Sequence, residues 1–187
     1  MGQTVIRGKI WVLADKGGKV IEDIDTDQIF HNAHLHITDV AQMGPYALGN
    51  LEGWKDFPNK VRAGDIVVAG RNFGAGSSRQ QAVDCFVALK VRAILAPSFS
   101  AIYFRNAVNS GFPIVRLTGL EALVAEGRLR TGDEIEVDLV TGKGRNLTQG
   151  FDFAAESMSA VQMDIFRAGD LFKFGKGRGQ TYTSDKI

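Results

Sequence analysis

The sequence predicts an α/β fold, on three observations. Short apolar, β-branched segments such as residues 65–69 (DIVVA) alternate with segments whose apolar residues recur at helical spacing. A strand, helix, strand, helix, strand series runs through residues 65–117, which implies parallel strands joined by right-handed crossovers. No linker-like run divides the 187 residues, of which 44% are hydrophobic, so we expect one domain over residues 1–187.

The first elements are a strand and a polar turn. Residues 5–13 (VIRGKIWVL) are β-branched and predict a strand. In EDIDTDQIF, residues 22–30, the aspartates Asp23, Asp25 and Asp27 are compatible with a turn, a cation site or a catalytic edge. Residues 31–59 then lose periodicity and collect glycine and proline. Long irregular connections tend to be functional, so we expect a lid over about residues 31–59.

The later elements follow the same signals. Strands are predicted at residues 65–69, 91–96 and 113–117, with a helix introduced by Pro97 and Ser98 and ended by Gly111. Thr118 is expected to cap a weak helix through residue 125. Residues 134–139 alternate as a one-sided strand does, and a glycine turn, TGKG, follows. Residues 159–168 predict a final helix closed by Gly169, and the last dozen residues are expected to fray.

The stretch at residues 70–90, GRNFGAGSSRQQAVDCFVALK, is the candidate site. Ser77 and Gln80 have the spacing of a capping box, which predicts a helix that starts near Ser77. The free N–H groups of a helix start, together with Arg79, favour a bound carboxylate or phosphate. The alternative is a capped helix with Arg79 as a surface cation. A cation in the first turn opposes the helix dipole, which favours the functional interpretation.

Composition excludes several classes of function. The 22 basic and 21 acidic residues are scattered, so there is no basic stripe for nucleic acid. No apolar run reaches the roughly 18 residues that span a bilayer, and charges interrupt the N-terminal segment where a signal peptide needs its apolar centre. We therefore expect a cytoplasmic protein that contacts neither nucleic acid nor membrane.

The thiol and imidazole groups do not predict a metal site. Cys85 is the only cysteine, which excludes an internal disulfide and a cysteine-rich metal centre within one chain, and its apolar neighbours favour a buried structural thiol. His31, His34 and His36 are close together, but no cysteine, aspartate or glutamate lies among them to complete a zinc site. We expect an exposed polar loop there.

Three segments together resemble a known family. DTDQI at residues 25–29, NFGAGSSR at 72–79 and FSAIYFRNAVNSGFPI at 99–114 are similar, in order and spacing, to the swivelling small subunits of the aconitase superfamily. The resemblance spans roughly residues 9–117 and is strongest to the small subunits of 3-isopropylmalate dehydratase and homoaconitase. It implies an α/β fold of the layered β/β/α swivelling type.

The resemblance also implies an activity and a partner. It implies a hydro-lyase that removes water from a 2- or 3-hydroxy acid and returns it at the neighbouring carbon, with a [4Fe–4S] cluster as Lewis acid. A chain with one cysteine cannot supply three thiolate ligands. The cluster is therefore expected on a separate large subunit, and this chain is expected to form the other wall of the active site.

Site residues follow from the matched motifs. By the resemblance, Ser77 is the serine that takes the proton, Ser78 and Arg79 hold substrate carboxylates, and Asp27 is an acidic residue at the edge of the active site. In the lid, a tetrapeptide selects the substrate, and the matching residues here are His34, Leu35, His36 and Ile37.

The chain departs from the family at two places. Relatives have Glu and His where Gln80 and Gln81 stand, and the lid tetrapeptide lacks the arginine that suits a third carboxylate. We therefore expect an alkyl-substituted malate as substrate: 3-isopropylmalate first, methyl- or dimethylmalate second, ahead of homocitrate or citrate. The alternative is that His36 faces solvent and another arginine, such as Arg71, reads the substrate. A catalytically inactive anion-binding or regulatory module and a purely structural domain are the other classes considered.

Overall fold

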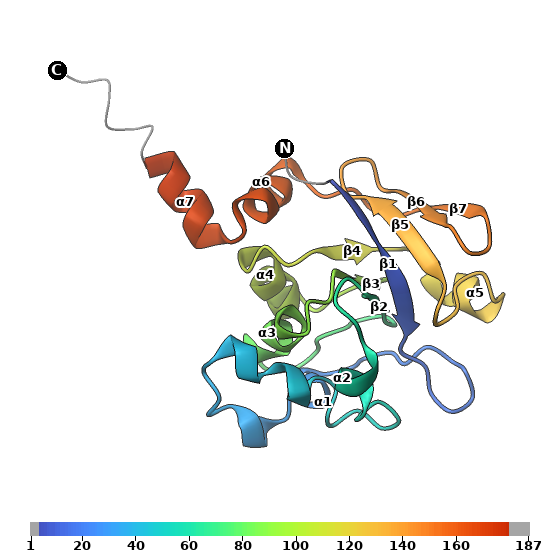
Figure 1. Ribbon diagram of the computed structural model, residues 1–187, viewed down its shortest axis with the longest axis horizontal. Coiled ribbons are helices and arrows are strands. Elements are labelled where there is room, and N and C mark those ends of the chain that lie inside the picture. Colours follow the sequence, from blue (N-terminus) through green and yellow to red (C-terminus); the bar gives the residue numbers. More distant parts are fainter. Residues whose placement is uncertain (1–3, 180–187) are drawn as a thin grey trace.

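A seven-stranded mixed β-sheet runs through the computed structural model, which describes residues 4–179 (Figure 1). The strands lie in the order β4-β3-β2-β1-β5-β6-β7. Neighbours from β1 to β4 pair in parallel, whereas β1, β5, β6 and β7 pair antiparallel. The strands are β1 Val5–Val12, β2 Ile66–Val68, β3 Ala93–Ala96, β4 Ile114–Arg116, β5 Glu134–Asp138, β6 Lys143–Asn146 and β7 Phe151–Ala154.

The helices divide between the two halves of the sheet. In Figure 1, α1 to α4 lie beside the parallel strands and α5 beside the antiparallel strands, while α6 and α7 pack against α4. They are α1 Thr26–Ile29, α2 Phe57–Lys60, α3 Gln81–Ala88, α4 Ala101–Asn109, α5 Leu120–Ala125, α6 Ala160–Ala168 and α7 Leu171–Gly179. None of these described helices combines the length and the apolar character that crossing a membrane requires.

Each face of the sheet carries its own hydrophobic core. Successive side chains of a strand point to opposite faces, so Val67 of β2 joins one core and Ile66 and Val68 join the other. The first core is aromatic and includes Phe73, Phe86 and Tyr103 under α3 and α4. The second lies between the sheet and α5 and α6. Burial on both faces explains why β2 reads as a continuous apolar run.

The α/β prediction and most predicted elements are confirmed. The strands predicted at residues 5–13, 65–69, 91–96, 113–117 and 134–139 correspond to β1 to β5, and the strands flanking α3 and α4 are parallel. Gly111 (φ 63°) follows the end of α4, and Gly169 (φ 95°) caps α6, as expected of glycines in the left-handed conformation that ends a helix.

Three predictions at element ends are wrong. Thr118 does not cap α5, which begins after Gly119 with no side-chain cap. The helix at residues 159–168 is not the last one, because α7 extends into the segment that was expected to fray; residues 180–187 lie outside the described residues. The sequence KGRN of β6 lacks β-branched residues and was missed as a strand. This strand forms through its pairing with β5 on one side and β7 on the other.

Residues 31–59 are more ordered than the irregular loop predicted there. They contain the short 3₁₀ helices η1 Asn32–His34, η2 Val40–Gln42 and η3 Gly44–Tyr46, followed by the start of α2. The second half is part of the core, since its buried side chains are Met43, Ala47, Leu48, Leu51 and Phe57. None of residues 31–42 is buried. Only this first half, residues 31–42, has the exposure of a lid, and we call it the lid below.

Candidate active site

The short helix α1 begins with a capping box, whereas the sequence predicted one at Ser77 and Gln80. Asp25 Oδ1 accepts a hydrogen bond from the Gln28 N–H (2.7 Å), and Gln28 Oε1 accepts one from the Asp25 N–H (2.9 Å). The two bonds satisfy donors that the start of a helix leaves free. Asp27 follows in the first turn of α1, so the aspartate-rich segment is a helix start.

The glycine loop that precedes α3 is fixed on both sides. Ala75 forms a parallel bridge with Asp25, and its carbonyl accepts a hydrogen bond from the Thr26 N–H (2.8 Å). Gly74 has φ 77°, and a Cβ atom there would lie 2.3 Å from Cγ of the buried Tyr103. Only glycine fits this position. The loop therefore has one conformation, determined by the aromatic core below it.

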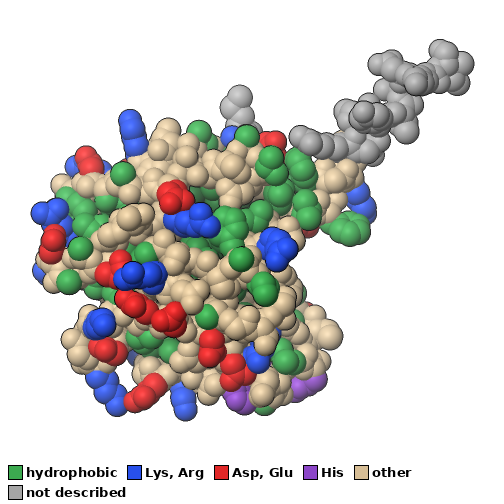
Figure 2. Space-filling model, turned by 180° about the vertical axis from the view of Figure 1, so that it is seen from behind, with side chains coloured by type: hydrophobic (Ala, Val, Ile, Leu, Met, Phe, Trp, Pro, Cys, Tyr) green, Lys and Arg blue, Asp and Glu red, His purple; other side chains and the backbone are tan. Residues whose placement is uncertain are grey.

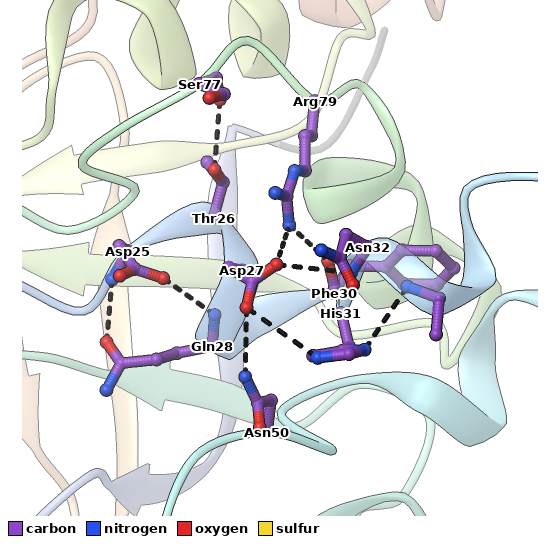
Figure 3. Close-up of polar contacts among 11 residues, drawn as sticks. Asp25, Thr26, Asp27, Gln28, Phe30, His31, Asn32, Asn50, Ser77 and Arg79 are labelled. Atoms are coloured by element: carbon purple, nitrogen blue, oxygen red, sulfur yellow. Dashed lines mark hydrogen bonds and ion pairs between the residues drawn. The ribbon is translucent and has the colours of Figure 1, made fainter.

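Two side chains join the glycine loop to α1 (Figure 3). Thr26 Oγ1 donates to the carbonyl of Ser77 (3.0 Å). Arg79 Nη1 donates to Asp27 Oδ1 (2.6 Å) and to the carbonyl of Phe30 (3.0 Å). The pair is separated by 52 residues in sequence, and the Arg79 side chain is only 14% exposed. The motifs DTDQI and NFGAGSSR thus form a single site.

Asp27 is the centre of this network. Besides Arg79, Oδ1 accepts a hydrogen bond from the Asn32 N–H (3.2 Å), and Oδ2 accepts one from Asn50 Nδ2 (3.0 Å). His31 Nε2 lies 3.9 Å from Oδ2. The hydrogen bond from Arg79 is the largest effect that holds the pKa of Asp27 below its usual value, with a smaller contribution from the Asn32 N–H. The carboxylate is therefore ionised at neutral pH and accepts hydrogen bonds from three groups, with His31 as a more distant neighbour.

The predicted helix start at Ser77 is wrong. Helix α3 begins at Gln81, and its first cap position, Gln80, makes no side-chain capping bond. Gln80 Nε2 instead donates to Asp84 Oδ1 (2.9 Å) and to Ser110 Oγ (2.7 Å). Residues 77–79 precede the helix because Gly76 (φ 88°) and the Thr26 bond to Ser77 hold them in the loop. Arg79 is thus not in the first turn, and Asp27 compensates its charge.

Both serines of the motif are exposed. The Ser78 hydroxyl accepts a weak hydrogen bond from Asn106 Nδ2 on α4 (3.4 Å). The Ser77 hydroxyl makes no hydrogen bond to any part of the chain that the structure describes, and its backbone carbonyl is the atom that is held. Ser77 thus presents a hydroxyl to the surface from a fixed backbone.

The four residues of the lid tetrapeptide point in two directions. The His34 ring stacks on Tyr46, with 4.1 Å between ring centroids, and Ile37 packs against the aromatic core. Leu35 and His36 are exposed. His36 Nδ1 lies 3.1 Å from the carbonyl of Ala33. Of the four predicted residues, Leu35 and His36 are therefore the most exposed, whereas His34 and Ile37 are partly buried by their packing.

Gln81, which together with Gln80 is one of the two departures from the family, contacts the lid. Its Nε2 donates to the carbonyl of Leu35 at 3.4 Å, which joins the start of α3 to the lid. Arg71, the alternative reader of a substrate, lies between Glu22 and Glu121 at 3.5 Å and 3.4 Å. Two carboxylates already compensate its charge.

The site lies on a mixed-charge surface. Figure 2 shows the histidines, all from residues 31–36, gathered at one edge of the molecule with acidic and basic side chains beside them. Sequence reasoning did not identify Thr26, Asn32 and Asn50 as members of this network. Asn32 contributes only its backbone N–H, and Asn50 is a single side chain after a glycine, so no sequence motif marks either residue. The fold alone brings these two groups to Asp27 and the Thr26 hydroxyl to the Ser77 carbonyl.

The residues of this chain do not fit an iron–sulfur cluster. Cys85 is fully buried, its Sγ donates weakly to the carbonyl of Ala82 (3.6 Å), and burial raises the pKa of the thiol far above its usual value. In residues 4–179 no three His, Cys, Asp or Glu side chains are grouped as metal ligands. A cluster needs several accessible thiolates, which one buried thiol does not provide.

The fold is a mixed α/β domain in which Arg79, paired with Asp27, lies on the same loop as the exposed Ser77. The profile described as the Aconitase C-terminal domain matches residues 19–118, more than half of the chain. The chain belongs to this family.

Relatives and a solved structure agree with that assignment. The chain is 42% identical over 166 residues to the 3-isopropylmalate dehydratase small subunit of Caldicellulosiruptor saccharolyticus, which covers 89% of this chain and 92% of that protein. It is 34% identical to the isopropylmalate/citramalate isomerase small subunit of Methanocaldococcus jannaschii, over 93% and 95%. A crystal structure of 3-isopropylmalate dehydratase (leuD) from the same organism superposes with a TM-score of 0.82 at 28% identity, over 97% of this chain and 99% of that one. The expected fold is therefore confirmed.

Proposed function

We propose that this chain is the small subunit of a hydro-lyase that dehydrates and rehydrates 3-isopropylmalate, in an active site completed by a large subunit. The observation that carries the proposal is the Arg79–Asp27 pair, which fixes a cation on the loop that also carries the exposed Ser77. The names of the relatives supply the substrate and the subunit class. The substrate is a dicarboxylate with a hydroxyl group, so it needs a fixed cation and a proton acceptor.

Arg79 would bind a substrate carboxylate. Its Nη1 is committed to Asp27 and Phe30, whereas the described residues provide no hydrogen-bond acceptor for Nη2 and Nε. A guanidinium donates along two edges, so one edge can stay on Asp27 while another receives the substrate. Ser78, on the same loop, would add a hydroxyl donor. Asp27 would then be a positioning residue that orients Arg79.

Ser77 would take and return the proton. In dehydration one carbon loses a proton and the neighbouring carbon loses its hydroxyl group, and the electron pair of the broken C–H bond forms the double bond. As its alkoxide, Ser77 Oγ would accept that proton to become the hydroxyl and give it back on rehydration, so that one group serves as base and acid. The described residues hold no base beside Ser77, so its activation would depend on Arg79, the substrate and the partner.

The [4Fe–4S] cluster would belong to the large subunit, since the single thiol of this chain is buried at the aromatic core. When bound there, the cluster would supply Lewis-acid chemistry at the shared site. A cytoplasmic location is proposed with this assignment, because a free thiol and an oxygen-sensitive partner both suit a reducing compartment.

An alkyl-substituted malate fits the exposed part of the lid. Leu35 offers an apolar side chain, and the imidazole of His36 lacks the planar fork of an arginine that would hold a third carboxylate. The relative that is named an isopropylmalate/citramalate isomerase supports methyl-substituted malates as second substrates. Homocitrate and citrate rank below both.

Reconstitution with a large subunit tests the proposal. The isolated chain should be inactive, and dehydration of 3-isopropylmalate, followed through the ultraviolet absorbance of the unsaturated product, should appear when an iron–sulfur large subunit is added. Ser77→Ala should abolish turnover without changing thermal stability, because the Ser77 hydroxyl caps no helix. Ser157→Ala, an exposed serine after β7, is the matched control and should keep wild-type turnover.

Two results would contradict the proposal. Dehydratase activity of the isolated chain would refute the need for a partner. Normal kcat of the Ser77→Ala complex would refute the assignment of the base.

A further inference from the structure

The Asp27 carboxylate binds both ends of the segment that carries the lid. At the start of the segment, the Asn32 N–H donates to Oδ1 (3.2 Å), and at its end Asn50 Nδ2 donates to Oδ2 (3.0 Å). The lid lies between these two anchors. Because Arg79 also donates to Oδ1, the same carboxylate orients the substrate-binding cation and closes the loop that carries the lid.

The backbone before Asn50 is shaped to deliver its side chain to Asp27. Leu48 has φ 57°, a left-handed conformation that costs a non-glycine residue free energy, and its N–H donates to the carbonyl of Ile29 at the end of α1 (2.8 Å). Gly49 follows, and a Cβ atom there would lie 3.0 Å from the carbonyl of Tyr46. This tight turn brings Asn50 against α1.

Packing does not explain the position of the Asn50 side chain. Asn50 is exposed and borders a cavity of about 310 Å³, whose other lining residues are His31, His34, Pro45, Tyr46 and Gly49. In the described part of the chain, its only side-chain hydrogen bond is the one to Asp27. The bond to the Asp27 carboxylate is therefore the polar contact that fixes this amide.

We propose that Asn50 is a positioning residue of the active site, which acts through Asp27 to hold Arg79 in its binding orientation and the lid in the position that it has in this structure. The inference deepens the proposed function and rests on it for the role of Arg79. The groups that face the amide are Asp27, from α1, and His31, from the lid, with Arg79 on the far carboxylate oxygen. Loss of the amide leaves Oδ2 with only the distant His31.

Asn50→Ala tests the proposal by activity. In the reconstituted complex, kcat/KM for 3-isopropylmalate should fall about 10- to 100-fold, the range that a hydrogen bond to a charged group is worth. The fall should lie mainly in KM, because Ser77 is untouched. Asn59→Ala, an exposed asparagine of α2 with no side-chain hydrogen bond to the described residues, is the matched control and should keep the wild-type kcat/KM.

Asn50→Asp adds a pH signature that a general structural defect would not give. Two carboxyl groups about 3 Å apart share one proton, which raises the pKa of one of them. At low pH the introduced carboxyl is protonated and can donate to Asp27, and as the pH rises this donation is replaced by repulsion. Relative to wild type, kcat/KM of Asn50→Asp should therefore fall as pH rises. Asn59→Asp should follow the wild-type profile throughout.

Hydrogen exchange of the small subunit alone gives a readout that does not depend on activity. Amide exchange in residues 31–42 should be about 10-fold faster in Asn50→Ala than in the Asn59→Ala control, because one anchor of the segment is lost. Wild-type kcat/KM together with wild-type exchange in both Asn50 variants would overturn the inference. Failure of the wild-type complex to convert 3-isopropylmalate would instead overturn the proposed function, and the exchange result would still decide whether Asn50 holds the lid.

Discussion

Asp27→Asn is expected to destabilise the domain by removing the charge that faces Arg79. The amide keeps the shape of the carboxylate, but it leaves a guanidinium that is 14% exposed without a counter-charge. A charge-assisted hydrogen bond contributes about 1.5–3 kcal/mol, and the Asp27 side chain is 32% exposed, so screening by solvent places the loss at the lower end, about 1–2 kcal/mol. For a domain of this size, that corresponds to a fall in Tm of about 2–8 °C.

The loss should depend on pH, with a sign that follows from the pKa of Asp27. The hydrogen bond from Arg79 lowers this pKa in the folded state, so ionised Asp27 stabilises the fold above its unfolded pKa of about 3.9. This stabilisation is lost as the pH falls through the lower folded pKa. The difference in Tm between wild type and Asp27→Asn should therefore be full at pH 7 and narrow as the pH falls below about 3.9.

Thermal unfolding followed by circular dichroism from pH 7 to about pH 3 measures this difference. Asp152→Asn is the matched control, because Asp152 pairs with Arg145 on the surface and its side chain is 72% exposed. That variant should unfold with wild-type Tm at every pH. A Tm difference for Asp27→Asn that is absent at pH 7, or that stays constant as the pH falls, would refute the reasoning.

Three further outcomes follow from the site and the core. Arg79→Lys should raise KM by about tenfold or more, because a lysine has no planar fork with which to donate to Asp27 and to a substrate carboxylate together. Steady-state kinetics of the complex measure this, and an unchanged KM would contradict it. Gly74→Ala should lower the free energy of unfolding, measured in urea, by about 3 kcal/mol, because the new Cβ atom would overlap Tyr103. Gly18→Ala is the control: Gly18 has φ 81° but open space around it, so this change should cost about 1 kcal/mol. Equal losses in the two variants would contradict the prediction. Among 3-isopropylmalate, citramalate, homocitrate and citrate, kcat/KM should be highest for 3-isopropylmalate because His36 has no carboxylate fork, and a preference for either tricarboxylate would overturn that argument.

Local signals predicted most of the fold. β-Branched runs located β1 to β5, and glycines with a left-handed conformation marked the ends of α4 and α6. Elements that depend on distant partners were missed or misplaced. Strand β6 has the sequence KGRN and becomes a strand only because β5 and β7 flank it, while Asn146, buried at its end, donates to the carbonyl of Arg128.

The candidate site was predictable in its parts but not in its geometry. Ser77, Arg79 and Asp27 were all named from the sequence, but their mutual arrangement depends on contacts across about 50 residues. The spacing of Ser77 and Gln80 fits a capping box, yet the bond from Thr26 to the Ser77 carbonyl competes with helix formation there. The equivalent spacing of Asp25 and Gln28 does form the box, and no local rule distinguishes the two pairs.

The place of β1 in the sheet also affects how the chain acquires its structure. β1 is hydrogen-bonded to β2 on one side, as in Ile10 opposite Ile66, and to β5 on the other, as in Gly8 opposite Ile135. During synthesis β1 emerges first, but its second partner leaves the ribosome more than 120 residues later. Until then one edge of β1 is unpaired, and such an edge is a template for association with other chains. We therefore expect slow, topology-limited folding, in which the pairing of β5 with β1 is a late step.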